Sequence, residues 1–226
     1  MNSKFSRGVL LGLFLTACSS APKTNTAVVS DSDAKAWLAQ YCSKGARNLS
    51  GDLVVKSNTK EFKGQFPAGI HVEPGGSFKM EVTNIIGGTQ LQISGHDGVM
   101  DITVPPKPQY SRKGVKNYLG IPVPVLTQLL LGDLPCPPVN ERVNIHAQGS
   151  QMVMQTPSWK WTFEKAEAKS GAVPVRVVLN ELGKSPDKAK QIELLIEDWD
   201  QDQNYAKKVS VKSPEGESKW TWRSRN

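Results

Sequence analysis

The chain has 226 residues, of which 38% are hydrophobic, 22% charged and 7% aromatic, which is an ordinary globular balance and enough for one substantial core. This composition excludes a disordered chain, a collagen-like chain and a membrane protein with many spanning helices. Lysine and arginine number 28, and aspartate and glutamate number 21. Without Lys4 and Arg7, which lie in an N-terminal leader, the net charge is 26 − 21 = +5. This surplus is modest and scattered, and we expect no nucleic-acid partner.

Residues 1–17 have the features of a signal peptide. Lys4 and Arg7 precede an apolar run of about seven to nine residues, far shorter than the ~20 that span a bilayer. The run ends in Leu-Thr-Ala-Cys at residues 15–18, which resembles the bacterial lipobox, in which the cysteine becomes the acylated N-terminus. Several acyl chains anchor a protein stably, so Cys18 would hold the chain at a membrane surface. Simple secretion after ordinary cleavage is the alternative.

Residues 18–30 would then be the acylated cysteine and a flexible tether. Residues 19–30 are small and polar, and twelve such residues have an r.m.s. span of about 20 Å. The folded domain, residues 31–226, would therefore stay near the bilayer. Ser19 and Ser20 include no aspartate, which by resemblance to bacterial lipoproteins favours export to the outer membrane.

The two remaining cysteines, Cys42 and Cys136, form an even pair in an oxidising compartment. A disulfide between them would close a loop of roughly 95 residues and would stabilise the fold by about 4 kcal/mol. Two separately buried thiols are the alternative, because the sequence does not show how far apart the two residues lie.

Two helices are predicted. The first has about 14 residues, with capping oxygens and negative charge at residues 31–33 and Gly45 at its end. Its apolar positions recur at helical spacing: Ala34, Trp37, Leu38, Tyr41 and Cys42. The second helix covers residues 123–131 and ends at Gly132, before several prolines.

From Leu49 onward the hydrophobic period changes from 3.6 to 2, which is typical of strands with one apolar face. The inward positions include Phe78, Met80, Val82, Leu91, Ile93, Met100, Ile102, Val104, Ile145, Trp159, Trp161, Phe163, Val177, Leu179, Ile192, Leu194, Ile196, Trp220 and Trp222. Turn sequences occur at residues 74–76, 97–98, 149–150 and 214–216. Short links and half-polar strands predict an antiparallel meander of about eleven strands.

Two helices are too few to cover such a sheet. A sheet of eleven strands would be about 50 Å wide and about 20 Å tall. The two predicted helices can cover less than half of that area. A curled sheet with a partial helical lid would therefore leave an apolar cavity suited to an apolar guest. We expect its wall to contain Met80, Val82, Leu91, Ile93, Met100, Leu126, Leu129, Leu130 and Trp161.

Catalytic motifs are missing from the sequence. His71, His96 and His146 are far apart, and no HExxH, CxxC, GxSxG or phosphate-binding loop is present. We expect no catalytic site, no metal and no cofactor. His71 with Glu73, or the aspartates of residues 198–202, could hold a cation, but such carboxylates are more often solvated. The Trp-x-Trp pairs could stack sugars or bases, although core packing is the commoner role.

Two motifs are similar to those of a known family. They are Thr-Asn-Ile-Ile-Gly-Gly-Thr-Gln-Leu at residues 83–91, and Tyr-Leu-Gly-Ile-Pro-Val-Pro at 118–124 followed by Leu-Leu-Leu-Gly at 129–132. They resemble the LolB family of outer-membrane lipoprotein receptors, over roughly residues 34–200. The resemblance implies an unclosed antiparallel β-barrel of eleven strands with helices inside, shared with the soluble partner LolA. The last 22 residues, from Tyr205, extend beyond where the family usually stops.

The resemblance implies a function without catalysis. The protein would be a monomer, lipid-anchored on the periplasmic face of the outer membrane. It would receive acylated lipoproteins, or other lipid cargo, from a LolA-like periplasmic carrier and insert them into that membrane. A structural or glycolipid-binding envelope lipoprotein with the same fold is the alternative.

Ile85 and Ile86 break the strand alternation just before a Gly-Gly pair, so at least one of them lies beyond the sheet at a hairpin tip. They could fold back as a small apolar cluster under the loop. In the LolB resemblance, however, Ile86 falls on the leucine of a protruding loop that is implicated in membrane insertion of the cargo.

Overall fold

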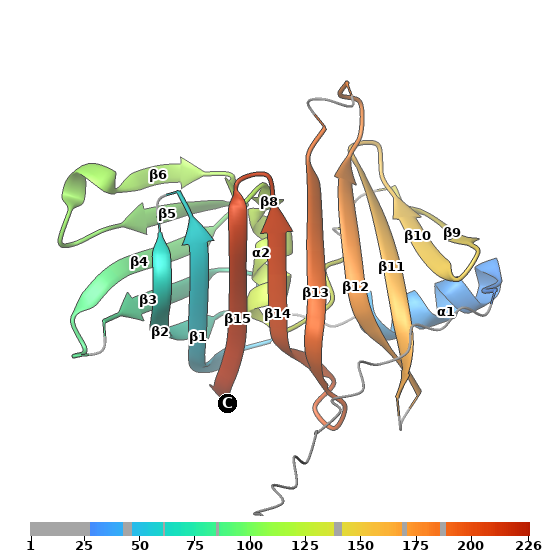
Figure 1. Ribbon diagram of the computed structural model, residues 1–226, viewed down its shortest axis with the longest axis horizontal. Coiled ribbons are helices and arrows are strands. Elements are labelled where there is room, and N and C mark those ends of the chain that lie inside the picture. Colours follow the sequence, from blue (N-terminus) through green and yellow to red (C-terminus); the bar gives the residue numbers. More distant parts are fainter. Residues whose placement is uncertain are drawn as a thin grey trace, which may run out of the picture.

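The computed structural model describes residues 28–42, 47–60, 62–84, 86–137, 142–168, 171–185 and 189–226. These residues form one large antiparallel sheet, two α-helices and a small two-stranded ribbon (Figure 1). The sheet curls without closing into a barrel, so the predicted fold class is confirmed. Among the described residues the sheet has thirteen strands, rather than about eleven.

The elements follow one another in a long meander. The first half contains α1 (Asp31–Cys42), β1 (Leu49–Thr59), β2 (Lys63–Val72), β3 (Phe78–Thr83), β4 (Thr89–His96), β5 (Val99–Thr103), the 3₁₀ turn η1 (Pro108–Tyr110) and β6 (Arg112–Val115). The ribbon β7 (Asn117–Tyr118) and β8 (Ile121–Pro122) leads into α2 (Val123–Leu130). The second half contains β9 (Asn144–Gln148), β10 (Gln151–Gln155), β11 (Trp159–Ala168), β12 (Gly171–Glu181), β13 (Gln191–Asp200), β14 (Tyr205–Ser213) and β15 (Gly216–Arg225).

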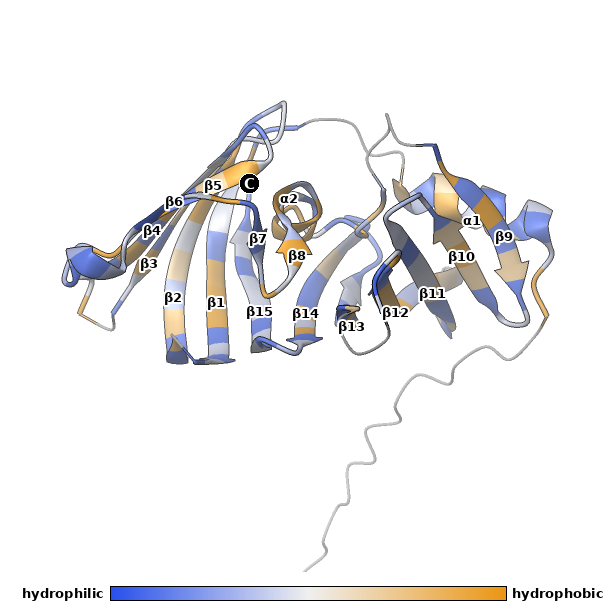
Figure 2. Cartoon of the chain, turned by 90° about the horizontal axis from the view of Figure 1, so that it is seen from above, coloured by the Kyte–Doolittle hydropathy of each residue, from blue (hydrophilic) through white to orange (hydrophobic). Residues whose placement is uncertain are grey.

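The first and last strands join the two halves of the meander. β1 pairs with β15 from Gly51 opposite Arg225 to Thr59 opposite Gly216, and the sheet order runs from β6 through β1 and β15 to β9. The sheet edges are therefore β6 and β9, which lie near the middle of the sequence. Helix α2, which lies between these edges in the sequence, is on the concave side of the sheet, as the view from above shows (Figure 2). All strand pairings and both helices lie within residues 28–226, so this part of the chain has its own core.

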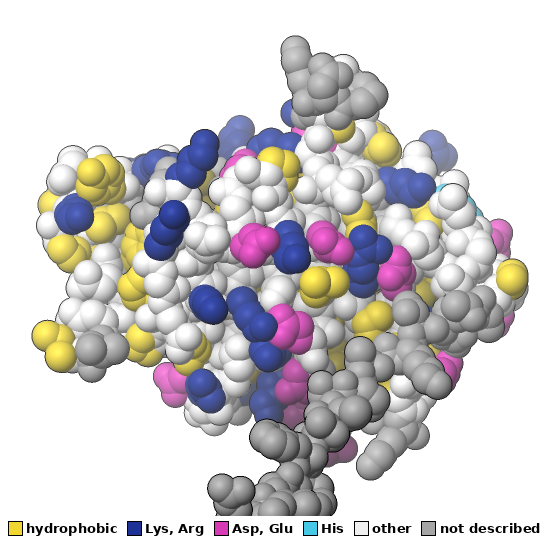
Figure 3. Space-filling view, viewed as in Figure 1, with side chains coloured by type: hydrophobic (Ala, Val, Ile, Leu, Met, Phe, Trp, Pro, Cys, Tyr) yellow, Lys and Arg dark blue, Asp and Glu magenta, His cyan; other side chains and the backbone are white. Residues whose placement is uncertain are grey.

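Strand alternation separates an apolar concave face from a polar convex face. On β13, for example, Ile192, Leu194 and Ile196 are buried, while Glu193 and Leu195 between them are partly exposed. The convex face carries acidic and basic side chains side by side (Figure 3). Arg176 on β12 binds Glu164 on β11 at 2.8 Å and Glu193 on β13 at 2.6 Å. Opposite charges on neighbouring strands thus stabilise the solvent-exposed convex face of the sheet.

Helix α1 covers the concave face near the β9 edge (Figures 1 and 2). Its cap is Ser30, whose Oγ accepts a hydrogen bond from the backbone N–H of Asp33 at 3.2 Å and donates to the Asp33 carboxylate. The predicted positions Ala34, Trp37, Leu38 and Tyr41 are buried. Trp37 Nε1 and Tyr41 Oη both donate to the carbonyl of Ala172 on β12, at 3.0 and 2.9 Å. The helix therefore fills the concave side of the second half of the sheet.

Helix α2 is short, apolar on nearly all sides and buried, which is typical of a core helix. It ends at Leu130, one residue before the predicted end, and Gly132, the predicted terminator, has a φ of 68°. The Gly132 N–H bonds to the Leu129 carbonyl at 2.9 Å and the Asp133 N–H to the Gln128 carbonyl at 2.8 Å, the Schellman pattern. A Cβ on Gly132 would also lie 2.9 Å from the Tyr205 ring. Both the backbone conformation and the close packing therefore require glycine.

Two arginines hold the C-terminal end of α2. Arg47 and Arg225 donate to the carbonyl of Leu131 at 3.1 and 2.8 Å, and Arg47 also pairs with Asp133. Arg225 belongs to β15, and its guanidinium lies 4.1 Å from the centre of the Tyr205 ring. Positive charge at a helix C-terminus is favourable, so these contacts fix α2 against the centre of the sheet.

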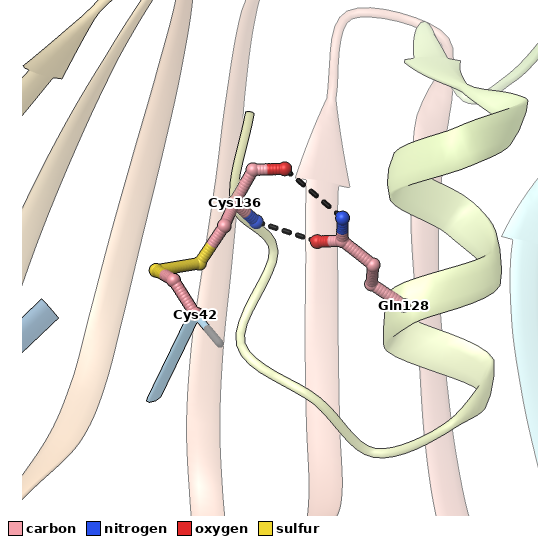
Figure 4. The surroundings of a disulfide bond; sticks show 3 residues. All are labelled: Cys42, Gln128 and Cys136. Atoms are coloured by element: carbon pink, nitrogen blue, oxygen red, sulfur yellow. Dashed lines mark hydrogen bonds between the residues drawn. A yellow bond between two sulfur atoms is a disulfide. The ribbon is translucent and has the colours of Figure 1, made fainter. Parts of the chain in front are cut away.

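A disulfide joins the segment after α2 to α1 (Figure 4). Cys42 and Cys136 are bonded, with their Cα atoms 5.7 Å apart. The Gln128 side chain of α2 forms two hydrogen bonds with the Cys136 backbone. It accepts one from the N–H at 2.6 Å and donates one to the carbonyl at 3.1 Å. Both helices are thus tied to one covalent link.

The carboxylate of Glu197 predicts a pH-dependent contribution to stability. Burial raises its pKa, but hydrogen bonds from Lys219, Ser210 and Lys208 outweigh burial and hold the pKa at about 2. Because the folded-state pKa is depressed, the stabilisation is present above the ordinary value of 4.5 and is lost as the pH falls toward 2. We expect Glu197→Gln to lower the free energy of unfolding by about 1 kcal/mol at pH 7. Urea denaturation should show that this difference disappears near pH 2, whereas Glu217→Gln, an exposed control, should change little at either pH.

The disulfide closes a long loop, because its cysteines are 94 residues apart. We expect the double variant Cys42→Ser, Cys136→Ser to lose about 2–5 kcal/mol of unfolding free energy. Reductant should lower the denaturation midpoint of the wild type toward that of the variant and leave the variant itself unchanged. Equal midpoints for the oxidised wild type and the variant would contradict this expectation.

Candidate functional site: an apolar cavity

The first half of the sheet encloses a cavity of about 1030 Å³ on its concave side. Strands β1 to β6 and β15 form its wall, and α2 with the β7–β8 ribbon borders it on the side toward the second half. Its volume is at the upper end of the ~300–1,000 Å³ typical of small-molecule sites. The cavity exists because α1 covers the second half of the sheet and no helix of the described residues covers the first.

Most of the wall residues predicted from alternation lie in this cavity. Met80, Val82, Leu91, Ile93 and Met100 line it from β3, β4 and β5, and Leu126 and Leu130 line it from α2. These strand residues point inward, whereas neighbours such as Glu81 and Gln92 are exposed on the other face. This part of the wall is therefore aliphatic.

Two of the predicted wall residues lie elsewhere. Leu129 is buried but does not line the cavity, since it lies about 100° around the helix from Leu130. Trp161 is buried on β11, which is four strands away from β15 in the sheet order. The alternation of apolar and polar residues correctly predicted that Trp161 lies on the inward face of its strand. The position of β11 along the sheet, however, depends on the pairing of β1 with β15, which alternation does not reveal.

The prediction missed several aromatic wall residues. Phe62 and Phe66 from the β1–β2 hairpin, Tyr118 from β7 and Trp220 from β15 all line the cavity. The Phe62 and Phe66 rings meet edge to face, with centroids 5.7 Å apart. Trp220 had been assigned to an inward strand face, so its alternation signal was available. No periodic pattern marks Phe62, which lies in the hairpin turn.

The charged wall residues all lie at one end of the cavity. Lys60, Lys63, Lys107 and Arg112 are cationic, and Glu215 is the one carboxylate among the described lining residues. Glu215 is itself paired with Lys190 at 2.9 Å. We call this group of five the rim.

Ile86 lies in the loop between β3 and β4 and is 88% exposed. The loop is organised by Asn84, whose Oδ1 accepts from the N–H of Ile86 at 3.1 Å and of Gly88 at 2.8 Å. Ile86 therefore does not belong to an apolar cluster under the loop. Ile85 and Cys18 lie outside the described residues.

The remaining candidates from the sequence form no further site. His71 Nδ1 and Ser50 Oγ form a hydrogen bond of 2.7 Å on the exposed side of the sheet. Within the described ranges, no three His, Cys, Asp or Glu residues are grouped closely enough to hold a metal ion. Among the same residues, no helix has the length and hydrophobicity needed to cross a membrane.

Comparison with known proteins gives a family match over most of the chain. A family model described as "Outer membrane lipoprotein LolB" matches residues 46–199. None of the curated proteins compared with the chain matches it. Among solved structures, the chain is similar to a DUF1329 family protein from Desulfovibrio piger, with 13% sequence identity and a TM-score of 0.47, over 87% of this chain and 91% of that one.

Filling the cavity should test its role without harming the fold. Ile102 lines the cavity from β5, and Thr103, the next residue, is exposed. We expect Ile102→Trp to weaken binding of a fluorescent fatty acid about tenfold, because losing contact with about two methylenes removes about 1.6 kcal/mol. Thr103→Trp is the matched control and should bind as the wild type does. Equal binding by both variants, at unchanged melting temperature, would place the ligand outside this cavity.

Proposed function

Because the chain belongs to the LolB family, whose members are non-enzymatic, lipoprotein-binding proteins of the outer membrane, we propose that it is a receptor that takes up acylated lipoproteins and inserts them into that membrane. The observation that carries this proposal is the apolar cavity of about 1030 Å³ on the concave side of the sheet. Its wall gives the acyl chains of the cargo an apolar environment similar to the hydrocarbon core of a membrane.

The energetics of acyl transfer support this role. Moving an acyl chain of about 15 methylenes through water costs about 12 kcal/mol, at ~0.8 kcal/mol per methylene. A cavity lined by Met80, Val82, Leu91 and Ile93 removes most of this barrier without nucleotide hydrolysis. The six residues of β3 span about 20 Å, and one leaflet's acyl chains occupy about 15 Å, half of the ~30 Å hydrocarbon core. The wall is therefore tall enough for a whole chain.

The donor in this proposal is a LolA-like periplasmic carrier with a similar cavity. Transfer between two such cavities exchanges one apolar environment for another, so its direction requires only a small difference in affinity. Delivery to the bilayer is then favoured because a membrane accepts the acyl chains and keeps them by mass action. We propose that the protein works as a monomer, since one cavity is complete within one chain.

The proposed lipid anchor is Cys18, and the proposed tether is the segment of residues 19–30. Among the described residues, Val29 already belongs to the folded domain, since it is buried and its N–H donates to the Gly149 carbonyl at 2.9 Å. Helix α1, which follows, lies at the opposite end of the sheet from the β3–β4 loop (Figures 1 and 2). The anchor and the loop can therefore reach one bilayer together when the long axis of the sheet lies along the membrane.

We propose that Ile86 enters the headgroup region of the bilayer and opens a path for the acyl chains. It is an aliphatic side chain 88% exposed, on a loop whose turn is formed by Asn84 and by Gly87, which has a φ of 88°. A loop held in this shape presents the side chain outward at little entropic cost. The same end of the sheet carries the rim of the cavity, so the membrane contact and the cargo lie close together.

The test separates uptake from delivery. We expect Ile86→Glu to keep the wild-type melting temperature and to load an acylated protein normally, because the side chain contributes almost nothing to the core. Transfer from the loaded protein to liposomes should fall about tenfold or more, since a carboxylate disfavours insertion into the bilayer interface.

Ile86→Leu is the matched control and should deliver at the wild-type rate. Unimpaired delivery by the Glu variant would remove the loop from the mechanism. Failure of the wild type to load any acylated protein would contradict the proposed function itself.

A further inference from the structure

The rim combines positive charge with an apolar cavity. Four cations, Lys60, Lys63, Lys107 and Arg112, line the cavity against one described carboxylate, Glu215, which Lys190 already neutralises. No described carboxylate forms an ion pair with any of the three lysines of the rim. An apolar wall whose mouth carries three lysines without a described carboxylate partner is unusual for a site that binds hydrocarbon alone.

The strand register explains why the rim is at one end. In an antiparallel meander the connections alternate between the two ends of the sheet, so β1–β2, β3–β4 and β5–β6 turn at the same end. The β14–β15 turn joins them, because Gly216 pairs with Thr59 at the end of β1. The rim residues come from these connections or from the strand ends beside them. Hydrophobic side chains gather beside basic ones at the end of the molecule formed by β4, β5 and β6 (Figure 3).

The residues beside the rim are suited to contact with a polar lipid headgroup. Arg112 is opposite Ile102 in the β5–β6 pairing, so its stem starts on the cavity face. Tyr110, from the same connection as Lys107, lines the cavity while remaining 59% exposed. A half-exposed tyrosine with an apolar ring and a polar hydroxyl is typical of a boundary between hydrocarbon and headgroups. The charge and the polarity therefore increase together from the cavity wall to the rim.

We propose that the cavity also binds an anionic phospholipid, with its acyl chains against the aliphatic wall and its phosphate among the cations of the rim. This inference rests on the proposed function, because it uses the same cavity, and it adds a class of ligand. An acyl chain joined to a cysteine through neutral ester and amide links offers no charge for the rim to neutralise. A phosphate offers oxygens to both lysine and arginine, and the apolar surroundings strengthen that attraction relative to water.

The experiment compares soluble short-chain lipids that differ only in the headgroup. The chain from residue 19 onward, which lacks Cys18 and contains the whole described fold, is titrated with dihexanoyl phosphatidylglycerol and dihexanoyl phosphatidylcholine below their micelle concentrations. We expect about tenfold tighter binding of the anionic lipid at low salt. The preference should shrink in 1 M NaCl, where the Debye length is about 3 Å. Inorganic phosphate alone should bind far more weakly, because it lacks acyl chains.

Two charge-matched variants locate the source of the preference. Lys60→Gln, Lys107→Gln, Arg112→Gln removes three cations from the rim. Lys56→Gln, Lys79→Gln, Lys212→Gln removes three exposed cations from the convex face. We expect the rim variant to bind both lipids with equal affinity at an unchanged melting temperature, and the convex-face variant to keep the tenfold preference.

Each other outcome overturns the proposal. Equal affinity of the wild type for both lipids means that the rim does not select an anion, and the proposed function stands. A preference that survives in the rim variant places the anion site elsewhere. If inorganic phosphate binds as tightly as the lipid, the rim is a free-anion site. If the variant differs only in attachment to vesicles of phosphatidylglycerol, the rim contacts a membrane surface. Binding of neither lipid nor fatty acid contradicts the proposed function as well.

Discussion

The pairing of β1 with β15 is the constraint on which the rest of the structure depends. It joins the two ends of the described fold and so forces the free edges of the sheet, β6 and β9, into the middle of the sequence. The connection between those edges includes α2, which lies inside the curl on the concave side (Figure 2). Arg225 on β15 binds the carbonyl of Leu131, so the joining strand also fixes the end of the helix that borders the cavity.

This constraint gives a structural role to the end of the chain. The family match ends at residue 199, near the end of β13, and the two strands that follow lie in the centre of the sheet between β13 and β1. β14 and β15 are thus part of the core rather than an appendage. Trp220 on β15 lines the cavity, and Lys208 and Lys219 on β14 and β15 pair with Glu197 at 3.1 and 2.6 Å on the opposite face. The same two strands therefore stabilise the polar convex face and complete the apolar concave face.

Alternation and turn residues were enough to predict most of this fold, because they report local physics. The inward face of Met80 and Leu91, the end of α2 just before Gly132 and the need for a cavity all follow from sequence period and from the small number of helices. The misplaced residues, Leu129 and Trp161, required non-local information: which strands neighbour each other, and how the helix is rotated about its axis. The bond between Cys42 and Cys136 is non-local in the same sense, since it depends on a contact across 94 residues.

The cavity and the disulfide are two results of the same distribution of helices. α1 fills the concave side of the second half of the sheet, where Trp37 and Tyr41 bind the Ala172 carbonyl, and this half becomes solid core. α2 is too short to cover the first half and is instead tied back toward α1, through Gln128 and the disulfide. Because one half is locked by helix packing and a covalent link, the other can keep an apolar wall unfilled without loss of the fold. Stability and binding capacity are therefore assigned to different halves of one sheet, and the helix between them is the boundary.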